Sequence, residues 1–235
     1  MAKTSLQCYF IAIYFKRRPP KGGFEEFGAT VSIALIDYNM GNLGSVAKAL
    51  EFLGAKCNVV DNAAELERFG ACILPGVGSF GDGMEALRSR GFDRALPEFI
   101  AGGKCFLGIC LGMQMLLESS EESPGVRGLG VFPGAVKKFR LDGLKVPHMG
   151  WNAVRIDTAS PAAAGLDAEE YFYFVHSYYV PAEASACVAK CVYGHPFAAM
   201  LGRGRCWATQ FHPEKSQHPG LRLLTNFLTL AGELK

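Results

Sequence analysis

The sequence lacks the features that would tie it to a membrane or to nucleic acid. No apolar run reaches the roughly 20 residues that a membrane-spanning helix needs. Neither sign of charge prevails, since 24 Lys and Arg residues are balanced by 22 Asp and Glu residues, which leaves a formal net charge of +2. The one dense basic cluster, residues 16–18, is short. We therefore expect no membrane and no nucleic acid as a partner.

Signals for bound metals and nucleotides are also scarce. The chain contains no P-loop motif. Cys187, Cys191 and His195 follow a C-x3-C-x3-H pattern. This spacing is not usual for zinc, and no fourth ligand is evident from the sequence. We expect no metal site.

What the sequence does contain is the composition of a globular protein. Its 235 residues are 49% hydrophobic and 20% charged, a balance that lets a chain of this length bury a large core in one compact unit. Several of the eight cysteines lie in apolar runs rather than in a dense framework of loops. We therefore expect reduced thiols and a cytoplasmic location.

The first 30 residues differ from the rest of the chain. Residues 8–15 are apolar, but no small-x-small cleavage site follows them, so they make a poor signal peptide. Residues 21–30 are polar and rich in Gly. We expect residues 1–30 to be an extension and residues 31–235 to form one domain. The extension is either a disordered tail or sequence upstream of a true start near Val31, and the second interpretation is slightly favoured.

Apolar runs alternate with helical patterns from residue 31 onward. Residues 31–37 form a nearly continuous apolar run, which is typical of a strand buried on both faces of a parallel sheet. Residues 45–53 carry apolar side chains at helical spacing. This order predicts parallel strands with right-handed crossovers. The next segments that we expect are strands at 57–60, 71–74 and 104–109 and helices within 84–100 and at 111–118.

After about Gly125 the pattern changes to closely spaced strands. Short turns between them indicate antiparallel or mixed additions to the sheet. We expect an α/β fold with a central, mostly parallel sheet, flanking helices and added antiparallel strands. The expected segments are strands at 131–139, 146–156, 170–180, 187–193, 198–201 and 206–211 and a last helix at 219–230.

A candidate nucleophile lies between the strand at 104–109 and the helix after it. Gly108, Cys110 and Gly112 form a Gly-x-Cys-x-Gly motif, which has the strand-turn-helix layout of a nucleophile elbow with sulfur in place of the serine oxygen. Such a turn strains the backbone, and the glycines leave room for close folding. The helix amides would favour the thiolate and could bind an oxyanion. The alternative is a buried structural cysteine.

Among the five histidines, His212 is the best candidate for the base. It follows an apolar strand, and an extended chain would point His212 and Glu214 to the same side. Pro213 fixes the local φ. A carboxylate beside the imidazole would orient it, as a Cys-His-Glu triad requires. The alternative is a surface ion pair at a strand end.

Two further loops could complete a site. Residues 75–78 follow the strand at 71–74 on the sheet edge where Cys110 should lie, and their amides could bind an oxyanion. The alternative is an ordinary turn. Residues 175–179 offer polar groups after an aromatic strand, unless that strand simply leaves the core.

Longer motifs resemble a known family. Residues 108–114 (GICLGMQ) and 210–216 (QFHPEKS) are similar to the class I, triad-type glutamine amidotransferases, whose fold is flavodoxin-like. Residues 37–43, 75–80 and 147–152 narrow the resemblance to the glutaminase subunits of imidazole glycerol phosphate synthase, from histidine biosynthesis. The likeness runs from about Val31 to the end of the chain.

The resemblance implies a role for each matching residue. Cys110 would attack the glutamine carboxamide and form a glutamyl thioester, while His212 moves the proton and Glu214 orients His212. The amide of Leu111, with one from Val77 or Gly78, would form the oxyanion hole. The residues implied in binding glutamine are Gly78, Gln114, His176, Ser177 and Tyr178.

The resemblance also implies a partner. Trp151 and Asn152 would lie near an interface with a separate (β/α)8-barrel cyclase subunit, which would receive the ammonia in a heterodimer. No cofactor is expected, because acyl transfer through a thioester needs none.

Three alternatives remain open from the sequence. The chain could be a thiol hydrolase or peptidase on an elbow scaffold, or a binding module with an inert Cys110. It could also be a sister amidotransferase serving anthranilate, aminodeoxychorismate or pyridoxal phosphate synthesis, although residues 147–152 argue against this.

Overall fold

The computed structural model describes residues 32–233. The predicted extension at residues 1–30 lies outside this range. Within residues 32–233, no helix is long and apolar enough to cross a membrane.

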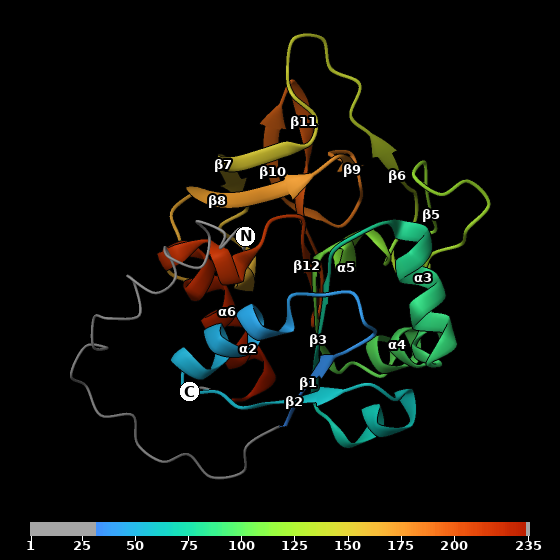
Figure 1. Ribbon diagram of the computed structural model, residues 1–235. Coiled ribbons are helices and arrows are strands. Elements are labelled where there is room, and N and C mark those ends of the chain that lie inside the picture. Colours follow the sequence, from blue (N-terminus) through green and yellow to red (C-terminus); the bar gives the residue numbers. More distant parts are fainter. Residues whose placement is uncertain (1–31, 234–235) are drawn as a thin grey trace, which may run out of the picture.

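One broad sheet forms the centre of the fold (Figure 1). Its main strands run β2-β1-β3-β4-β12-β11-β10-β7-β8 across the sheet. The pairs from β2 to β12 are parallel, and the pairs from β12 to β8 are antiparallel. The predicted α/β fold is therefore confirmed. These strands are β1 (Ile33–Ile36), β2 (Cys57–Val60), β3 (Ala71–Gly76), β4 (Cys105–Cys110), β7 (His148–Ile156), β8 (Glu169–His176), β10 (Cys187–Tyr193), β11 (His195–Arg203) and β12 (Cys206–Thr209).

Helices cover both faces of the parallel half (Figure 1). The side chains of β1 alternate between the faces: Ile33 and Leu35 lie in the core beneath α2 and α6, and Ala34 and Ile36 lie in the core beneath α3 and α4. This confirms the prediction of a strand buried on both faces. The helices are α2 (Leu43–Phe52), α3 (Phe80–Ser89), α4 (Phe92–Ala101), α5 (Leu111–Gln114) and α6 (Gln217–Ala231), with short 3-10 turns η1 (Ala63–Arg68), η2 (Pro161–Ala163) and η3 (Pro213–Lys215).

The helix after the elbow is shorter than predicted. We expected it to span residues 111–118, but α5 ends at Gln114. The carbonyls of Met115 and Leu116 instead accept hydrogen bonds from the amides of Leu129 and Phe132, at 2.8 and 3.0 Å. Because a distant loop takes up these carbonyls, the chain leaves the helix and passes into the small strands β5 (Ser119–Ser120) and β6 (Ala135–Lys138).

The strand predicted at 170–180 is in fact two strands. β8 ends at His176, and β9 (Tyr178–Pro181) starts after Ser177. β8 pairs with β7, whereas β9 pairs with β11 and β6. The carbonyl of Ser177 accepts a hydrogen bond from the amide of Phe139 at 3.0 Å. Because of the break, the first part of this segment pairs with β7 and the second part pairs with β11 and β6. The break lies beside the candidate site.

Candidate active site

Three parallel strands end together at one edge of the sheet. β3 and β4 pair so that Gly76 lies opposite Cys110, and β4 and β12 pair so that Ile109 lies opposite Thr209. The residues that follow β3 and β12 are therefore brought to the end of β4. This pairing closes the separation of about a hundred residues between Cys110 and His212, and it occurs at the edge where open α/β sheets bind their ligands.

Cys110 has the strained backbone expected of a nucleophile elbow. Its φ of 55° and ψ of −106° are rare for a residue with a side chain. A Cβ atom on Gly112 would collide with the carbonyl oxygen of Leu74, and one on Gly108 would lie 2.9 Å from the carbonyl oxygen of Gly112. Both glycines are thus required by close backbone contacts, as predicted.

His212 and Glu214 form a buried pair. The distance from His212 Nδ1 to Glu214 Oε1 is 2.8 Å, and their side chains are only 3% and 1% exposed. The alternative of a surface ion pair is therefore wrong. The expected extended geometry is also wrong, because residues 213–215 form the 3-10 turn η3, which returns Glu214 to the ring. Pro213, whose fixed φ suits either conformation, starts this turn.

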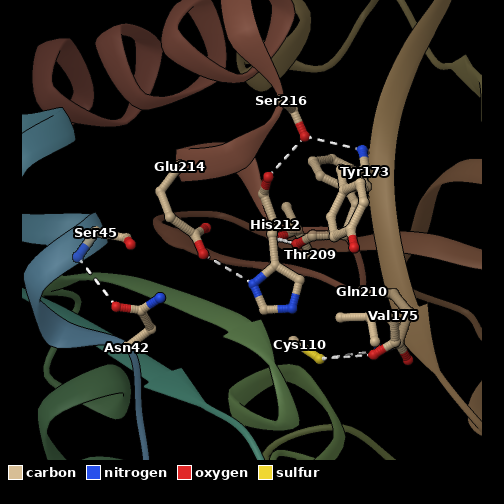
Figure 2. Close-up of polar contacts among 11 residues, drawn as sticks. Asn42, Ser45, Cys110, Tyr173, Val175, Thr209, Gln210, His212, Glu214 and Ser216 are labelled. Carbon is tan, nitrogen blue, oxygen red and sulfur yellow. Dashed lines mark hydrogen bonds and ion pairs between the residues drawn. The ribbon is translucent and has the colours of Figure 1, made fainter. Parts of the chain in front are cut away.

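The backbone of His212 is held by Ser216. The hydroxyl of Ser216 donates to the carbonyl of His212 at 2.6 Å and accepts from the amide of Tyr173 at 3.0 Å. The amide of His212 donates to the carbonyl of Tyr173, also at 3.0 Å. Figure 2 shows these contacts joining the loop of His212 to β8. The backbone that carries the imidazole is thus held by hydrogen bonds to β8, one of the antiparallel strands.

Cys110 lies beneath the imidazole of His212 in Figure 2. Burial opposes a positive charge on this ring, but the negative charges of Cys110 and Glu214 outweigh burial and raise the pKa of His212. Nε2 of His212 has no hydrogen-bond partner within residues 32–233. The arrangement favours a protonated imidazole, with one ring nitrogen free to exchange a proton at the sulfur.

Gln210 also contacts the sulfur, a role that sequence reasoning missed, since its one signal was the place of Gln210 two residues before His212. Its Nε2 donates to Cys110 Sγ at 3.8 Å, and its Oε1 accepts from Gln114 Nε2 at 3.0 Å. The carbonyl oxygen of Val175 lies 3.9 Å from the same sulfur (Figure 2). Cys110 therefore has polar neighbours other than His212.

The candidate oxyanion loop lies beside the elbow. Gly76 packs so tightly that a Cβ atom on it would meet the hydroxyl of Tyr38 and, at 2.8 Å, the Cβ of Leu111. Val77 is 42% exposed, and Gly78 has a φ of +104°. The fold thus brings residues 76–78 and Leu111 to the same edge.

The candidate glutamine-binding residues differ in whether their side chains already form hydrogen bonds within the protein. The Nε2 of Gln114 donates to the carbonyl of Tyr178 at 3.0 Å as well as to Gln210. The ring of His176 is buried, with Nδ1 2.7 Å from the same carbonyl. Ser177 and Tyr178 are half-buried. The side chains of Gln114 and His176 are therefore engaged within the protein.

An apolar surface lies on the hairpin of β7 and β8. Trp151 is 46% exposed and packs edge-on against Tyr173, with 6.2 Å between ring centroids. Met149 and Tyr171 on the same strands are exposed as well. Asn152 is half-buried beneath this surface and donates to the carbonyl of Val192 at 3.0 Å.

No metal centre stands out in the part of the chain that the structure describes. Residues 32–233 contain no group of three His, Cys, Asp or Glu side chains that could hold a metal ion.

Known proteins resemble this chain along most of its length. A family model described as "Glutamine amidotransferase class-I" matches residues 34–231. The imidazole glycerol phosphate synthase subunit HisH of Rhodopirellula baltica is 48% identical, over 86% of this chain and 99% of that relative. Subunit HisH 1 of Campylobacter jejuni is 49% identical, over 84% of this chain and 100% of that relative.

Solved structures share the fold. A glutamine amidotransferase crystal structure aligns with a TM-score of 0.68 and 22% identity, covering 86% of this chain and 99% of that chain. PurLQS from Thermotoga maritima aligns with a TM-score of 0.67 and 19% identity, over 86% and 99% of the two chains. The chain belongs to the class I glutamine amidotransferases and, within them, to the family of imidazole glycerol phosphate synthase HisH subunits.

Proposed function

We propose that this chain is the glutaminase subunit of an imidazole glycerol phosphate synthase and hydrolyses glutamine to glutamate and ammonia. The observation that carries the proposal is the convergence of a strained Cys110 with the buried pair of His212 and Glu214, in a chain of the HisH family. We assign residues 31–235 to the amidotransferase domain and the protein to the cytoplasm.

The chemistry follows from the charges in the site. The Cys110 sulfur attacks the carboxamide carbon, and the C–S bond forms as the oxygen becomes negative. His212 gives its Nε2 proton to the leaving nitrogen, so that the C–N bond breaks and ammonia departs from a glutamyl thioester. His212 then takes a proton from water as the water oxygen bonds to the thioester carbon, and the C–S bond breaks, which releases glutamate and returns the sulfur as a thiolate beside the protonated ring. Glu214 holds the ring in place and stabilises its positive charge.

Other residues would bind the substrate and the oxyanion. The amide of Leu111 and an amide of residues 77–78 would donate to the negative oxygen, as the strained elbow and the adjoining loop suggest. Gly78 and the backbone of residues 176–178 would hold glutamine. The engaged side chains of Gln114 and His176 would shape this site rather than contact substrate.

The ammonia needs an acceptor close by. In bulk water at neutral pH most of it becomes ammonium, which is a poor nucleophile. We propose that a (β/α)8-barrel cyclase subunit docks on the apolar surface around Trp151 and Asn152 and takes up the ammonia. Exposed apolar side chains on β7 and β8 support a protein partner there.

A coupled assay tests the proposal. The isolated chain should hydrolyse glutamine slowly, and the rate should rise on addition of the cyclase barrel with its nucleotide ligand. Brisk hydrolysis that ignores the partner would contradict the assigned pathway. Release of peptide or ester products without ammonia would favour a thiol hydrolase instead.

Cys110→Ala separates the two halves of the reaction. The variant should lose glutamine hydrolysis by at least about a thousandfold, while the complex still makes product from added ammonium. Glutaminase activity that survives the substitution would remove Cys110 from its role.

A further inference from the structure

A continuous chain of hydrogen bonds runs from the sulfur of Cys110 to the surface of β7. Its members come from four parts of the chain, the end of β12, α5, β8 and β7, and we call them the relay: Gln210, Gln114, His176, His148 and Asn152. The two halves of the relay meet at the backbone carbonyl of Tyr178, which accepts from both Gln114 Nε2 and His176 Nδ1.

The outer half has only one consistent assignment of protons. The amide of Asn152 uses Oδ1 to accept from the amide of Ala153 at 2.8 Å, so its Nδ2 donates to His148 Nε2 at 3.2 Å. His148 therefore carries its proton on Nδ1 and donates it to His176 Nε2 at 3.0 Å. His176 in turn carries its proton on Nδ1 and donates to the carbonyl of Tyr178. Each ring is neutral and has both nitrogens satisfied.

The inner half ends as a donor to the sulfur. Gln114 gives both protons of Nε2 away, one to Tyr178 and one to Gln210 Oε1. This fixes the amide of Gln210, whose Nε2 then points a proton at Cys110 Sγ. A donor at this place stabilises the thiolate rather than the thiol.

We propose that the relay positions the Cys110 thiolate and connects it to Asn152 at the partly exposed surface of β7, on the face opposite Trp151, so that a contact made at Asn152 changes the reactivity of the sulfur. Its buried members are His148, His176, Gln114 and Gln210, and a gap at any one of them leaves a buried polar group unpaired. The link to a partner at this surface rests on the proposed function.

Alkylation of Cys110 by iodoacetamide tests the relay in the intact chain. The rate at which the Cys110 peptide is labelled is followed by mass spectrometry as a function of pH, with Cys110→Ala as the background. Gln210→Leu, which removes the donor to the sulfur, should slow labelling about tenfold near neutral pH. Asn152→Ala should slow it about threefold. His212, Glu214 and Tyr38, the other titratable groups near the sulfur, are the same in both variants.

A control variant distinguishes an effect transmitted through the relay from a general loss of stability after removal of asparagine hydrogen bonds. Asn226 Nδ2 donates to the carbonyls of Ala162 and Ala164, at 2.7 and 2.9 Å. Asn226→Ala removes two hydrogen bonds of an asparagine side chain on α6, away from the relay, whereas Asn152→Ala removes three. It should leave the labelling rate and its pH profile unchanged.

A double-mutant cycle gives the decisive result. If the relay acts as a unit, Asn152→Ala should add nothing to the effect of Gln210→Leu, whereas independent sites would give about a thirtyfold loss. The proposal would be overturned if the fold-losses in labelling rate of Asn152→Ala and Gln210→Leu multiply in the double variant. It would also be overturned if Asn152→Ala is labelled at the same rate as the unmodified chain at every pH. If Gln210→Leu does not fold, His148→Phe takes its place in the cycle, since a Phe ring can keep the stacking on Tyr193 and Phe174. Labelling needs neither glutamine nor a partner, so this outcome is independent of the proposed function.

Discussion

Two buried histidines lie near the same site, and at neutral pH only one of them, His212, is held in the positively charged form. His212 lies beside Glu214 and the sulfur of Cys110, whereas His176 lies between a backbone carbonyl and the neutral ring of His148. Burial disfavours a positive charge on both. For His212 the neighbouring negative charges outweigh burial and raise its pKa, and for His176 burial prevails and lowers its pKa to about 3.

The two histidines show how one site can hold one imidazole protonated and another neutral at the same pH. The charge of the neighbours, not the depth of burial, decides which ring can carry a proton at neutral pH. In the proposed reaction His212 would therefore pass protons to and from the substrate, while His176 keeps a fixed tautomer beside the carbonyl of Tyr178. Substitutions at Glu214, His148 and Ser216 each remove one side of this contrast.

The largest effect is expected from Glu214→Gln, which removes the negative charge from the His212 side. A glutamine amide can also donate to Nδ1 and hold the ring in the wrong tautomer. We expect kcat for glutamine hydrolysis to fall by about 10²- to 10⁴-fold. Steady-state ammonia release measures it, and a loss below about twofold would contradict the role of Glu214.

Glu169→Gln is the control for that variant. Glu169 also pairs with a cation, Arg155, at 3.3 Å, but both side chains are largely exposed. Exposed ion pairs contribute little. The isolated chain should keep its rate within about twofold.

His148→Phe tests whether His148 is held neutral in the folded chain, through the pH dependence of the free energy of unfolding. Burial lowers the pKa of His148 to about 4, below the value of the unfolded chain. The unfolded chain therefore binds the proton first, and the folded state loses stability as the pH falls below about 6.5. The shift for His212 has the opposite sign, because its stabilisation is complete below about pH 6.5 and is lost as the pH rises.

The measurement is urea unfolding at pH 7 and pH 5. The drop in unfolding free energy between these values should be about 2 kcal/mol smaller in His148→Phe than in the unmodified chain. Equal drops in both proteins would show that His148 is not held neutral.

A smaller effect is expected from Ser216→Ala, which loosens the support of His212. The substitution leaves the amide of Tyr173 without its acceptor and removes one of the two hydrogen bonds to the carbonyl of His212, which also accepts from the amide of Lys215 at 3.0 Å. We expect a loss of about 1–3 kcal/mol in unfolding free energy and a moderate fall in kcat. Thr229→Ala, which removes an exposed hydroxyl bonded to its own helix, should cost less than about 0.5 kcal/mol. Equal losses in the two variants would contradict the support by Ser216.

The sequence revealed the features that depend on local spacing. The four-residue apolar run of β1, the Gly-x-Cys-x-Gly motif around Cys110 and the proximity of His212 to Glu214 were all predicted, because each rests on neighbouring residues. The hydrophobic period also located most strands within a few residues.

Features that depend on distant partners were missed. α5 stops early because residues 129 and 132 capture the carbonyls of the two residues that follow it, and the strand break at Ser177 follows from pairing with β6 and β11. The turn η3 could not be told from extended chain, since Pro213 suits both. The relay joins residues 114, 148, 152, 176 and 210, which share no spacing, so only the folded chain brings them into one line.

The central claim is that the Cys110 sulfur becomes acylated by glutamine. Acid quenching during turnover with labelled glutamine, followed by peptide mapping, measures this directly. We predict a glutamyl group on the peptide that contains Cys110, and no such group in Cys110→Ala. Steady ammonia release with no labelled Cys110 peptide, or with the label on another residue, would contradict the account.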